Sequence, residues 1–380
     1  CDIVLLSYES PRLLRECVES VLEHTRVRSR LIIVDNGSRD PGVASYLNAV
    51  HGNDRVSVEK VFSEENAGFA AGMNKGLRLA DAPYICWLNN DCVVTEGWLE
   101  EMIKVASAAD NIGLVNPQSN TFGSDPDTGA TVNDHAALLK SKSGSYVETG
   151  HVIGFACLMK KELLDRIGYL DEGYEGVCYE DTDYSLRAAE AGYIPVVAEA
   201  AYVLHREQAS RKDLPGKEEI YRKNRLKLEK KWGKLFRLFV IGYPPAHSSM
   251  AAGYDVLVPL ARRRCFIDVL IENRYREKRD LAAPERRRKP RHADISYKEK
   301  NPAVLPFYAL WKVITKKKKY NAVFVRKGLL LSILRVTAPL RGISVLELKE
   351  GFVLGTGDGR EIDLKDTASV TRYLRGAENG

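Results

Sequence analysis

The chain has 380 residues, about twice the length of a typical domain, so we expect two domains with a core in each. Apolar residues make up 44% and charged residues 28% of the sequence, which is typical of a globular protein and excludes an intrinsically disordered chain. No uninterrupted apolar run reaches the roughly 18 residues that a membrane-spanning helix needs. This argues against an integral membrane protein.

The seven cysteines are scattered and form no Cys-x-x-Cys pair. Their odd number and spacing argue against a disulfide framework or a structural zinc site and favour a reducing cytoplasm. No signal peptide precedes the strand-like segment Asp2–Leu6. Because the chain also lacks an initiator Met, we expect its natural start to lie further upstream.

The net charge of +6 divides unequally along the chain. Residues 1–235 hold 28 Lys and Arg against 36 Asp and Glu, a balance of −8, whereas residues 236–380 hold 29 against 15, a balance of +14. An acidic half repels an anionic substrate unless a cation mediates, and a basic half suits a phosphate-bearing surface such as nucleic acid or anionic lipid. We therefore expect two domains of different character, 1–235 and 236–380.

In the first half, short apolar runs rich in β-branched residues alternate with stretches of helical period, which is the pattern of a mostly parallel sheet covered by helices. The predicted strands are Asp2–Leu6, Leu31–Asp35, Val56–Val61, Tyr84–Leu88, Gly113–Val115, Phe155–Lys160 and Ile194–Val197. The predicted helices are Pro11–His24, Gly68–Ala80, Glu96–Ala108, Asp181–Ala191 and Lys217–Trp232. Residues 116–150 show no clear period and predict a functional loop or lid.

The second half begins with a predicted β-α-β unit. Its elements are the strand Leu238–Tyr243, a Pro-rich turn, the helix Met250–Arg264 and the strand Phe266–Ile271. The charged stretch Arg274–Lys300 predicts a loop or a poorly ordered connector. Order is predicted to resume with the helix Phe307–Thr315, the strand Ala322–Arg326, the helix Gly328–Val336 and the strand Ile343–Leu348.

Polar residues follow four predicted strands of the first half at the points where the strands end. They are Ser7 and Tyr8, Asp35 to Ser38, Asn66 to Phe69, and Asn89 to Asp91. Ligands of open α/β sheets bind at the carboxyl ends of the strands. Turn and capping roles stay open for each residue taken singly, but four clusters at one edge predict a single pocket.

Five motifs, in this order, carry a resemblance to a known family. They are V-D-N-G-S (34–38), N-A-G-F-A-A-G-M-N-K-G (66–76), L-N-N-D (88–91), G-Y-L-D-E-G-Y (168–174) with E-D-T-D-Y-S-L-R-A-A-E-A-G-Y (180–193), and V-L-H (203–205). The pattern resembles the family 2 glycosyltransferases of the GT-A fold and is most similar to the group with rhamnosyl- and galactofuranosyl-transferases. The resemblance covers about residues 1–235 and implies an α/β nucleotide-sugar-binding domain with a mostly parallel mixed sheet.

The resemblance implies that an acceptor hydroxyl displaces a nucleoside diphosphate from the anomeric carbon of a sugar. It assigns Asp91 and His205 to a divalent cation, Mn²⁺ or Mg²⁺, that neutralises the leaving diphosphate. The family pattern at this strand end is Asp-x-Asp, whereas this chain has Asn89, Asn90 and Asp91, so an amide replaces the first carboxylate. A structural, partly buried imidazole is the alternative for His205.

The same resemblance makes Asp181 the general base that takes the acceptor proton, with Glu180 and Asp183 shaping the acceptor pocket. One carboxylate opposite the leaving group implies inversion at the anomeric carbon. Ordinary helix-dipole partners, worth about 0.3 to 1 kcal/mol each, are the alternative role for acids at the start of a helix.

A larger set of residues is implied to bind the nucleotide sugar, of UDP or dTDP type. These residues are Tyr8, Asp35, Asn66, Gly68, Asn74, Asn89 and Asn90. The implied acceptor is a glycan or a lipid-linked saccharide in surface polysaccharide synthesis.

Residues 236–375 bear a weaker resemblance to the N-terminal, acceptor-side half of a GT-B glycosyltransferase, a Rossmann-like α/β domain. The β-α-β start and the segments V-R-K-G-L-L-L (325–331) and L-E-L-K-E-G (346–351) carry it. A complete GT-B enzyme needs a second such half, so we expect either a chain cut from a longer two-transferase polypeptide or a docking module. Lys316–Lys319 and Arg286–Lys289 are ordinarily solvated, and peripheral contact with an anionic membrane at its inner face is the alternative.

The leading hypothesis is thus an inverting, metal-dependent glycosyltransferase of the cytoplasm. The alternative is a catalytically degenerate nucleotide-sugar-binding or docking module of a larger multi-transferase protein, which the amide of Asn89 favours. A sugar-nucleotide pyrophosphorylase needs a Gly-rich phosphate loop with Arg after the first strand, which Ser7–Ser10 does not supply. A nucleic-acid binder explains the basic half but nothing in the first, so we expect no nucleic-acid partner.

Overall fold

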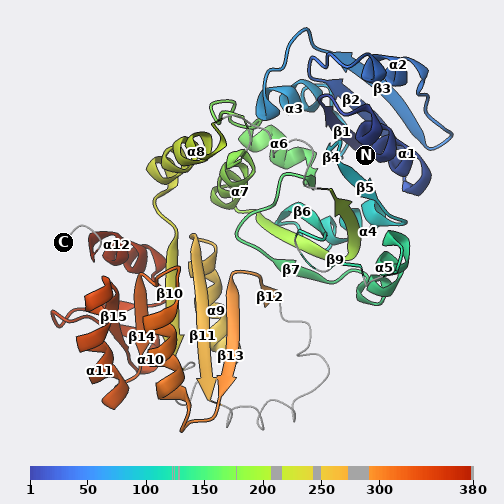
Figure 1. Cartoon of the computed structure of the whole chain (residues 1–380). Helices are drawn as coiled ribbons and strands as arrows, with labels where there is room; N and C mark the ends of the chain where they lie inside the picture. Colours follow the sequence, from blue (N-terminus) through green and yellow to red (C-terminus); the bar gives the residue numbers. More distant parts are fainter. Residues whose placement is uncertain are drawn as a thin grey trace. The chain divides into compact units, whose positions relative to one another are not determined.

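The computed structural model describes residues 1–121, 123, 125–126, 129–176, 178–206, 216–242, 250–272 and 291–377. It divides into two compact units, Cys1–Gly233 and Lys234–Gly380 (Figure 1). Among the residues that it describes, no helix combines the length and apolar character needed to cross a bilayer.

A mixed, mostly parallel sheet forms the centre of the first unit. Its strands lie in the order β7 (Tyr146–Glu148), β9 (Ile194–His205), β6 (Ile112–Gln118), β8 (Ala156–Lys160), β4 (Tyr84–Asn89), β1 (Asp2–Ser7), β2 (Ser29–Asp35) and β3 (Val56–Phe62). β8 runs antiparallel to β4 and β6, whereas the pairs formed by β4, β1, β2 and β3 are parallel. The short strand β5 (Cys92–Val94) pairs antiparallel with the end of β9.

Helices cover both faces of this sheet. They are α1 (Pro11–His24), α2 (Pro41–Ala49), α3 (Phe69–Leu77), α4 (Trp98–Ala106), α5 (Val132–Leu139), α6 (Lys161–Ile167) and α7 (Glu180–Glu190). A further helix, α8 (Lys217–Trp232), packs through Leu228 in a separate apolar cluster with Leu186 of α7. Ile3 and Leu5 of β1 belong to one apolar cluster with α1, α2 and α4, and Val4 and Leu6 belong to another with α3, α6 and α7. Successive side chains of a strand point to opposite faces, so the two clusters are the two sides of one buried sheet.

The glycines of the 66–76 motif serve the packing of α3 on this sheet. A Cβ atom at Gly76 would lie 2.3 Å from Val4 Cγ1, and one at Gly72 would lie 2.7 Å from Leu6 Cδ1. Only residues without a side chain allow the helix to come this close to β1.

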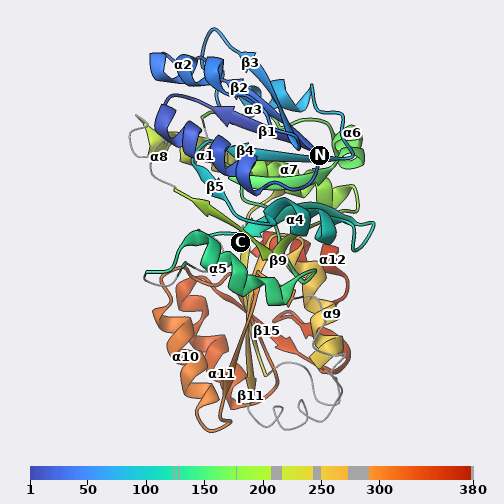
Figure 2. The same ribbon diagram turned by 90° about the vertical axis from the view of Figure 1, so that its right-hand side faces the viewer.

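The second unit is a three-layer α/β structure. Its strands lie in the order β13 (Ile295–Lys300), β11 (Cys265–Glu272), β10 (Phe236–Ile241), β14 (Ala322–Val325), β15 (Ser344–Leu348), β16 (Val353–Gly355) and β17 (Glu361–Asp363). The first five are parallel and, numbered along the chain, follow the order 3-2-1-4-5 of a Rossmann fold. Helices α9 (Met250–Ala261) and α12 (Thr367–Ala377) cover one face, and α10 (Leu305–Thr315) and α11 (Leu329–Thr337) cover the other (Figure 2).

Most predicted elements are present, but three expectations were wrong. Residues 116–150 contain the end of β6, helix α5 and strand β7, and α5 begins with a capping box between Thr131 and Asp134. The stretch 274–300 contains strand β13, a largely solvent-accessible edge strand whose polar sequence hides it from a hydrophobicity pattern. β9 continues to His205, well beyond Val197. The Pro-rich turn 244–249 and the run 286–289 lie outside the described residues.

Candidate functional site

The polar clusters that follow β1, β2 and β4 meet at one edge of the first sheet. Ser7 lies opposite Asp35 in the parallel pair of β1 and β2, and Leu6 lies opposite Asn89 in the pair of β1 and β4. The loop after β3 reaches the same edge, because Asn36 Nδ2 donates to Asn66 Oδ1 at 2.9 Å. Ligands of parallel sheets bind at such an edge.

Asp91 and His205 form the centre of this edge. The pairing of β5 with β9 sets Cys92 opposite His205 and brings Asp91 Oδ1 to 3.3 Å from His205 Nε2. Both residues are buried, at 5% and 4% exposure. The imidazole stacks on Phe155 with ring centroids 5.0 Å apart, and Asn120 accepts from the His205 backbone N–H and donates to its carbonyl oxygen.

Several buried polar atoms at this point have no hydrogen-bond partner within the described part of the chain. They are Asp91 Oδ1, His205 Nδ1, Asn89 Oδ1 and Asn90 Nδ2. Buried polar atoms are nearly always paired, so such a set indicates that a further group binds among them. A carboxylate oxygen beside an imidazole nitrogen fits a cation such as Mn²⁺ or Mg²⁺.

Cys92 belongs to the same cluster, since its Sγ and one atom each of Asp91 and His205 lie within 4.8 Å of one another. Burial and, second, the nearby charge of Asp91 raise the pKa of the Cys92 thiol well above its usual value. Its Sγ donates to the carbonyl oxygen of Phe155 at 3.4 Å. In this state Cys92 is a protonated thiol, and the two hard donors of the cluster are Asp91 and His205.

Asp181, in the first turn of α7, lies at the same edge. The backbone N–H of Gly154 donates to Asp181 Oδ2 at 2.9 Å, and Gly154 directly precedes Phe155. Phe155 in turn accepts a hydrogen bond from the backbone of Asn89 at 2.8 Å and stacks on His205. The N–H and the hydroxyl of Thr182 donate to the other carboxylate oxygen of Asp181, at 2.6 and 3.2 Å, so both oxygens have fixed positions.

Two side chains that the sequence analysis did not single out hold the 152–156 segment against Asp181. Asn116 accepts from the N–H of Ile153 at 2.7 Å and donates to the carbonyl oxygens of Ile153 and Ala156. Ser185 accepts from the N–H of Val152 and donates to the carbonyl oxygen of Asp181. In the sequence, Asn116 stands out only by its position at the end of a predicted strand, and Ser185 only by its place in the E-D-T-D-Y-S motif. Neither position predicts which residue the side chain contacts.

Asn36, which lies inside the V-D-N-G-S motif, is the residue that joins the loops after β2 and β3. Besides Asn66, its amide contacts the carbonyl oxygen of Gly68 at 3.1 Å and the N–H of Ala67 at 3.2 Å. Asp35 is buried and accepts from the N–H of Ser38, which closes the turn. Gly68 has a φ of +83°, a conformation that favours glycine, and the Tyr8 side chain is exposed beside these loops.

Two predicted site residues have their polar atoms engaged by other residues of the first unit. Asn74 bonds to the backbone of Leu170 through both amide atoms and to Glu172, and these bonds hold the loop after α6 against α3.

Asp183 is fully buried and has no surface to offer an acceptor. Its carboxylate contacts Tyr174, Arg187, Lys231 and Trp232. Glu180, the first residue of α7, is also buried.

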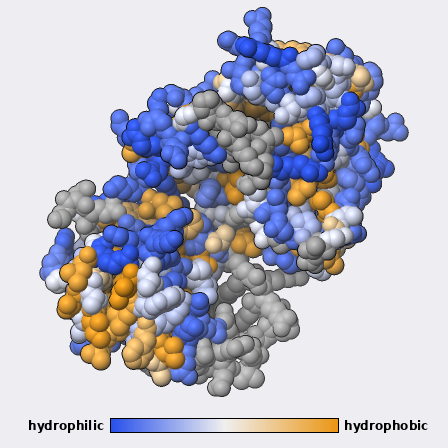
Figure 3. Space-filling model, in the orientation of Figure 1, coloured by the Kyte–Doolittle hydropathy of each residue, from blue (hydrophilic) through white to orange (hydrophobic). Residues whose placement is uncertain are grey.

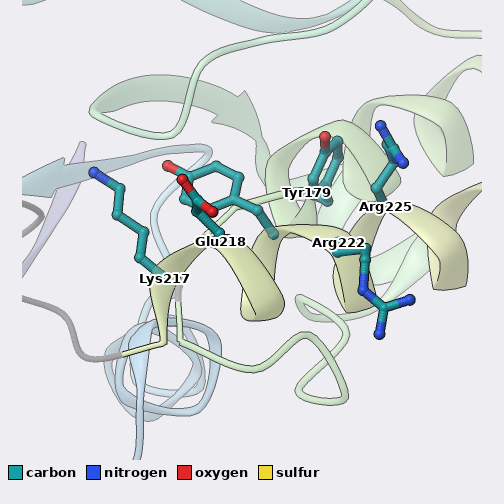
Figure 4. Close-up of a pocket in the computed structure, with 6 residues that line it drawn as sticks. Tyr179, Lys217, Glu218, Arg222 and Arg225 are labelled. Carbon is teal, nitrogen blue, oxygen red and sulfur yellow. The ribbon is translucent and has the colours of Figure 1, made fainter.

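A pocket of about 410 Å³ lies between the turn into α7 and the first turns of α8 (Figure 4). Its lining residues are Tyr179, Lys217, Glu218, Tyr221, Arg222 and Arg225. Tyr179 immediately precedes Glu180 and Asp181, and it and Cys178 have φ values of 77° and 92°. Non-glycine residues rarely adopt such values, and backbone strain of this kind clusters at functional sites. Of the three cations in the lining, Arg222 pairs with Glu219 and Arg225 lies 3.9 Å from Glu229.

Comparison with known proteins supports the resemblance of the first unit. Residues 2–168 match the model of glycosyl transferase family 2. The expected resemblance to this family is therefore confirmed over these residues, and the expected α/β fold class, a GT-A domain with a mostly parallel mixed sheet, is confirmed.

Individual relatives match parts of the chain. Uncharacterized protein y4gI of Sinorhizobium fredii is 25% identical over 249 residues, which are 61% of this chain and 27% of the relative. Glycosyltransferase GlyG of Streptococcus pneumoniae is 30% identical over 110 residues, 29% of this chain and 36% of the relative. The chain thus spans well under two thirds of these relatives. Among solved structures, mannosyltransferase PcManGT from Pyrobaculum calidifontis, in complex with GDP-Man and Mn²⁺, is 17% identical with a TM-score of 0.43, covering 68% of this chain and 79% of that one.

Proposed function

We propose that the chain is an inverting glycosyltransferase that moves a sugar from a nucleoside diphosphate to a hydroxyl of a glycan or lipid-linked saccharide. The observation that supports this most is the buried contact of Asp91 with His205 at the edge where Asp181 is held, within a family 2 domain. Surface polysaccharide synthesis in the cytoplasm is the biological setting we propose.

The donor nucleoside, of UDP or dTDP type, would lie against the loops that Asn36 joins. Tyr8, Asp35, Asn66 and Gly68 are the contacts we assign to it, since they surround the ends of β1, β2 and β3. Asn89 Oδ1 and Asn90 Nδ2 are buried without a partner among the described residues. The amide oxygen of Asn89 suits a hydrogen bond from a sugar hydroxyl, and the amide nitrogen of Asn90 suits donation to a diphosphate oxygen.

Asp91 and His205 would hold a divalent cation, Mn²⁺ or Mg²⁺, through one oxygen and one nitrogen. Such a cation, when bound, neutralises the negative charge that the leaving diphosphate gains. Asn89 occupies the position of the family's first carboxylate, so we expect this site to bind a cation more weakly than a two-carboxylate site.

Asp181 would act as the general base. The acceptor oxygen forms a bond to the anomeric carbon while the bond to the diphosphate oxygen breaks and its electron pair leaves with the diphosphate. The proton of the acceptor hydroxyl moves to a carboxylate oxygen of Asp181, whose orientation Gly154 and Thr182 maintain. A base on the face opposite the leaving group gives inversion in a single displacement.

We assign the acceptor to the side of α7 where Tyr179 and α8 line the pocket, because this pocket borders the turn that carries Asp181. Glu180 stays our candidate for shaping this region. The second candidate function is a degenerate nucleotide-sugar-binding or docking module, which the amide at Asn89 favours.

The test is a screen of UDP-, dTDP- and GDP-sugars, with and without Mn²⁺, on the wild type, Asp181→Asn and the control Glu190→Gln, which changes an exposed acid at the other end of α7. Thermal shift reports binding, because a bound donor stabilises the folded state, and release of nucleoside diphosphate reports turnover. We expect Asp181→Asn to retain the donor-induced shift and to lose turnover by about 10² to 10⁴-fold, while Glu190→Gln retains both.

Unchanged turnover in Asp181→Asn would remove this residue from the role of base. A donor-induced shift without turnover in the wild type, with any donor and acceptor, would favour the binding module.

A further inference from the structure

Helix α10 carries apolar residues on two different faces. Leu305, Ala309 and Val313, spaced by four, are buried in the apolar cluster on the second sheet. A second set lies at or just before the helix and is exposed to solvent: Val304, Phe307, Trp311 and Ile314. A surface helix of a globular protein normally presents polar residues on its outer face, so this second face is unusual.

Helix α11 and the turn after it extend the exposed set with Leu329, Val336 and Leu340. α10 and α11 pack in the same buried cluster, so they cover the same face of the second sheet. Arg341 donates hydrogen bonds to the carbonyl oxygens of Val313 and Ile314, which ties the turn with Leu340 to the end of α10. Figure 3 shows the apolar surface over these two helices.

We call these seven residues, Val304, Phe307, Trp311, Ile314, Leu329, Val336 and Leu340, the α10–α11 face. They are between 50% and 84% exposed. The large apolar side chains exposed in the described part of the first unit, such as Phe62 and Leu138, lie singly on different elements. Single exposed apolar residues are ordinary, whereas a contiguous set on adjacent helices marks an interaction surface.

The charges beside the α10–α11 face are basic. Lys317, Lys318 and Lys319 follow the last turn of α10 and are exposed, and none of them has an ion pair within the residues that the structure describes. By contrast, Lys312 and Lys316 of the same segment pair with Asp268. The unpaired lysines thus add to the charge of the basic half of the chain.

The α10–α11 face combines aromatic and aliphatic side chains with neighbouring lysines that have no ion pair among the described residues. This combination indicates which kind of partner the face fits. Protein–protein interfaces are depleted in Lys, whereas helices that lie on membranes combine Trp, Phe and Leu with Lys and Arg. Lysines near an anionic bilayer gain free energy from the lipid phosphates. The chemistry of the face therefore fits a lipid surface better than a protein.

We propose that the α10–α11 face docks on an anionic lipid bilayer, with Phe307 and Trp311 in the headgroup region and Lys317 to Lys319 against the lipid phosphates. The docking is independent of the catalytic residues, so its failure and the failure of the proposed transferase activity are distinguishable. If both hold, the docking brings the chain to the surface where a lipid-linked acceptor lies.

The first test is sedimentation of the full chain with vesicles of phosphatidylcholine, with or without phosphatidylglycerol. We expect binding to the anionic vesicles that weakens as salt is added. We expect the variant with Phe307→Ser and Trp311→Ser, and the variant with Lys317, Lys318 and Lys319 all changed to Ser, each to lose about tenfold or more in partitioning. The matched control is Leu138→Ser, which removes a 68% exposed leucine from α5 and leaves binding unchanged.

The second test measures insertion. Of the four tryptophans, Trp311 is exposed, Trp87 and Trp98 are buried, and Trp232 is half-buried in an apolar cluster of the first unit. Lipids with brominated acyl chains should therefore quench mainly Trp311 fluorescence, and Trp311→Phe should remove most of the quenching. Absence of wild-type binding to anionic vesicles, or full binding by both multiple variants, would overturn the proposal. Concentration-dependent dimerisation that Phe307→Ser abolishes would also overturn it and would assign the face to a second copy of the chain.

Discussion

Each unit has an aspartate at its sheet, Asp91 in the first and Asp268 in the second. The two carboxylates differ in the hydrogen-bond donors that surround them. Asp268 of β11 accepts hydrogen bonds from Ser296, Lys316 and Tyr320, and its Oδ2 lies 3.0 Å from Lys312 Nζ. Burial alone would raise the pKa of Asp268, but these hydrogen bonds outweigh it and hold the pKa well below its usual value. Asp268 therefore serves the fold.

Asp91 of the first unit is more deeply buried but has no such set of donors. Its Oδ1 faces only the imidazole of His205 and has no hydrogen bond within the described part of the chain. Leaving a buried carboxylate oxygen unpaired is costly, and natural proteins keep such groups mainly where a ligand completes them. The comparison teaches that the number of hydrogen-bond donors around a carboxylate, more than its burial, distinguishes Asp268, which serves the fold, from Asp91, for which we propose a role in function.

The same contrast occurs within two residues of α7. Asp183 is fully buried and saturated by two cations and two aromatic donors. Asp181 is half-buried, and its donors among the described residues are the neutral groups of Gly154 and Thr182. Three substitutions, one each at Asp91, Asp183 and Asp268, test whether the number of donors around an aspartate predicts the effect of replacing it.

The largest expected effect is on activity, for Asp91→Asn. We expect turnover to fall about 10³-fold, the loss typical of removing a charge-stabilising group from an active site. Thermal stability should stay the same or rise, because the substitution removes a buried carboxylate whose Oδ1 has no hydrogen bond within the described residues. Nucleoside diphosphate release and thermal unfolding are the two measurements. A variant that unfolds several degrees lower and keeps its turnover would assign Asp91 to the fold.

The next effect is on stability, for Asp183→Asn. Arg187 and Lys231 would lose their buried partner, and breaking such a pair costs about 3 to 5 kcal/mol. Urea unfolding of the first unit measures this loss. Donor binding by the molecules that stay folded should be unchanged, and a selective loss of activity at wild-type stability would contradict the structural role.

The smallest effect is expected for Asp268→Asn, about 2 kcal/mol, the value of a charged hydrogen bond near the surface. Because folding lowers the pKa of Asp268, the folded state binds its proton less readily than the unfolded chain. The stabilisation is therefore fully present above pH about 4 and declines as the pH falls. Unfolding of wild type and variant between pH 7 and pH 3 should show the smaller acid dependence in the variant. The exposed Asp255→Asn is the control, and an identical dependence in both proteins would exclude this linkage.

Local patterns in the sequence predicted most strands of the first sheet and the polar clusters that meet at its edge. Runs such as Leu31–Asp35 are buried on both faces, so they are apolar throughout and visible without coordinates. The polar residues after them converge because parallel strands end at one edge. Strand β13 and helix α5 were missed because edge strands and short helices carry no strong period.

By itself, then, the sequence determined the α/β class, most of the strands and the resemblance of the first unit to family 2 glycosyltransferases, since these depend on patterns within a few residues. Only the tertiary structure decided which polar side chains are free to bind. Asn74 is engaged by Leu170 and Glu172, nearly a hundred residues away, and Asn116 holds Ile153. The tertiary structure also decided that Phe307 and Trp311 face solvent. The spacing of apolar residues in the sequence shows that one face of a helix is apolar. Whether that face is exposed depends on which other elements pack against it.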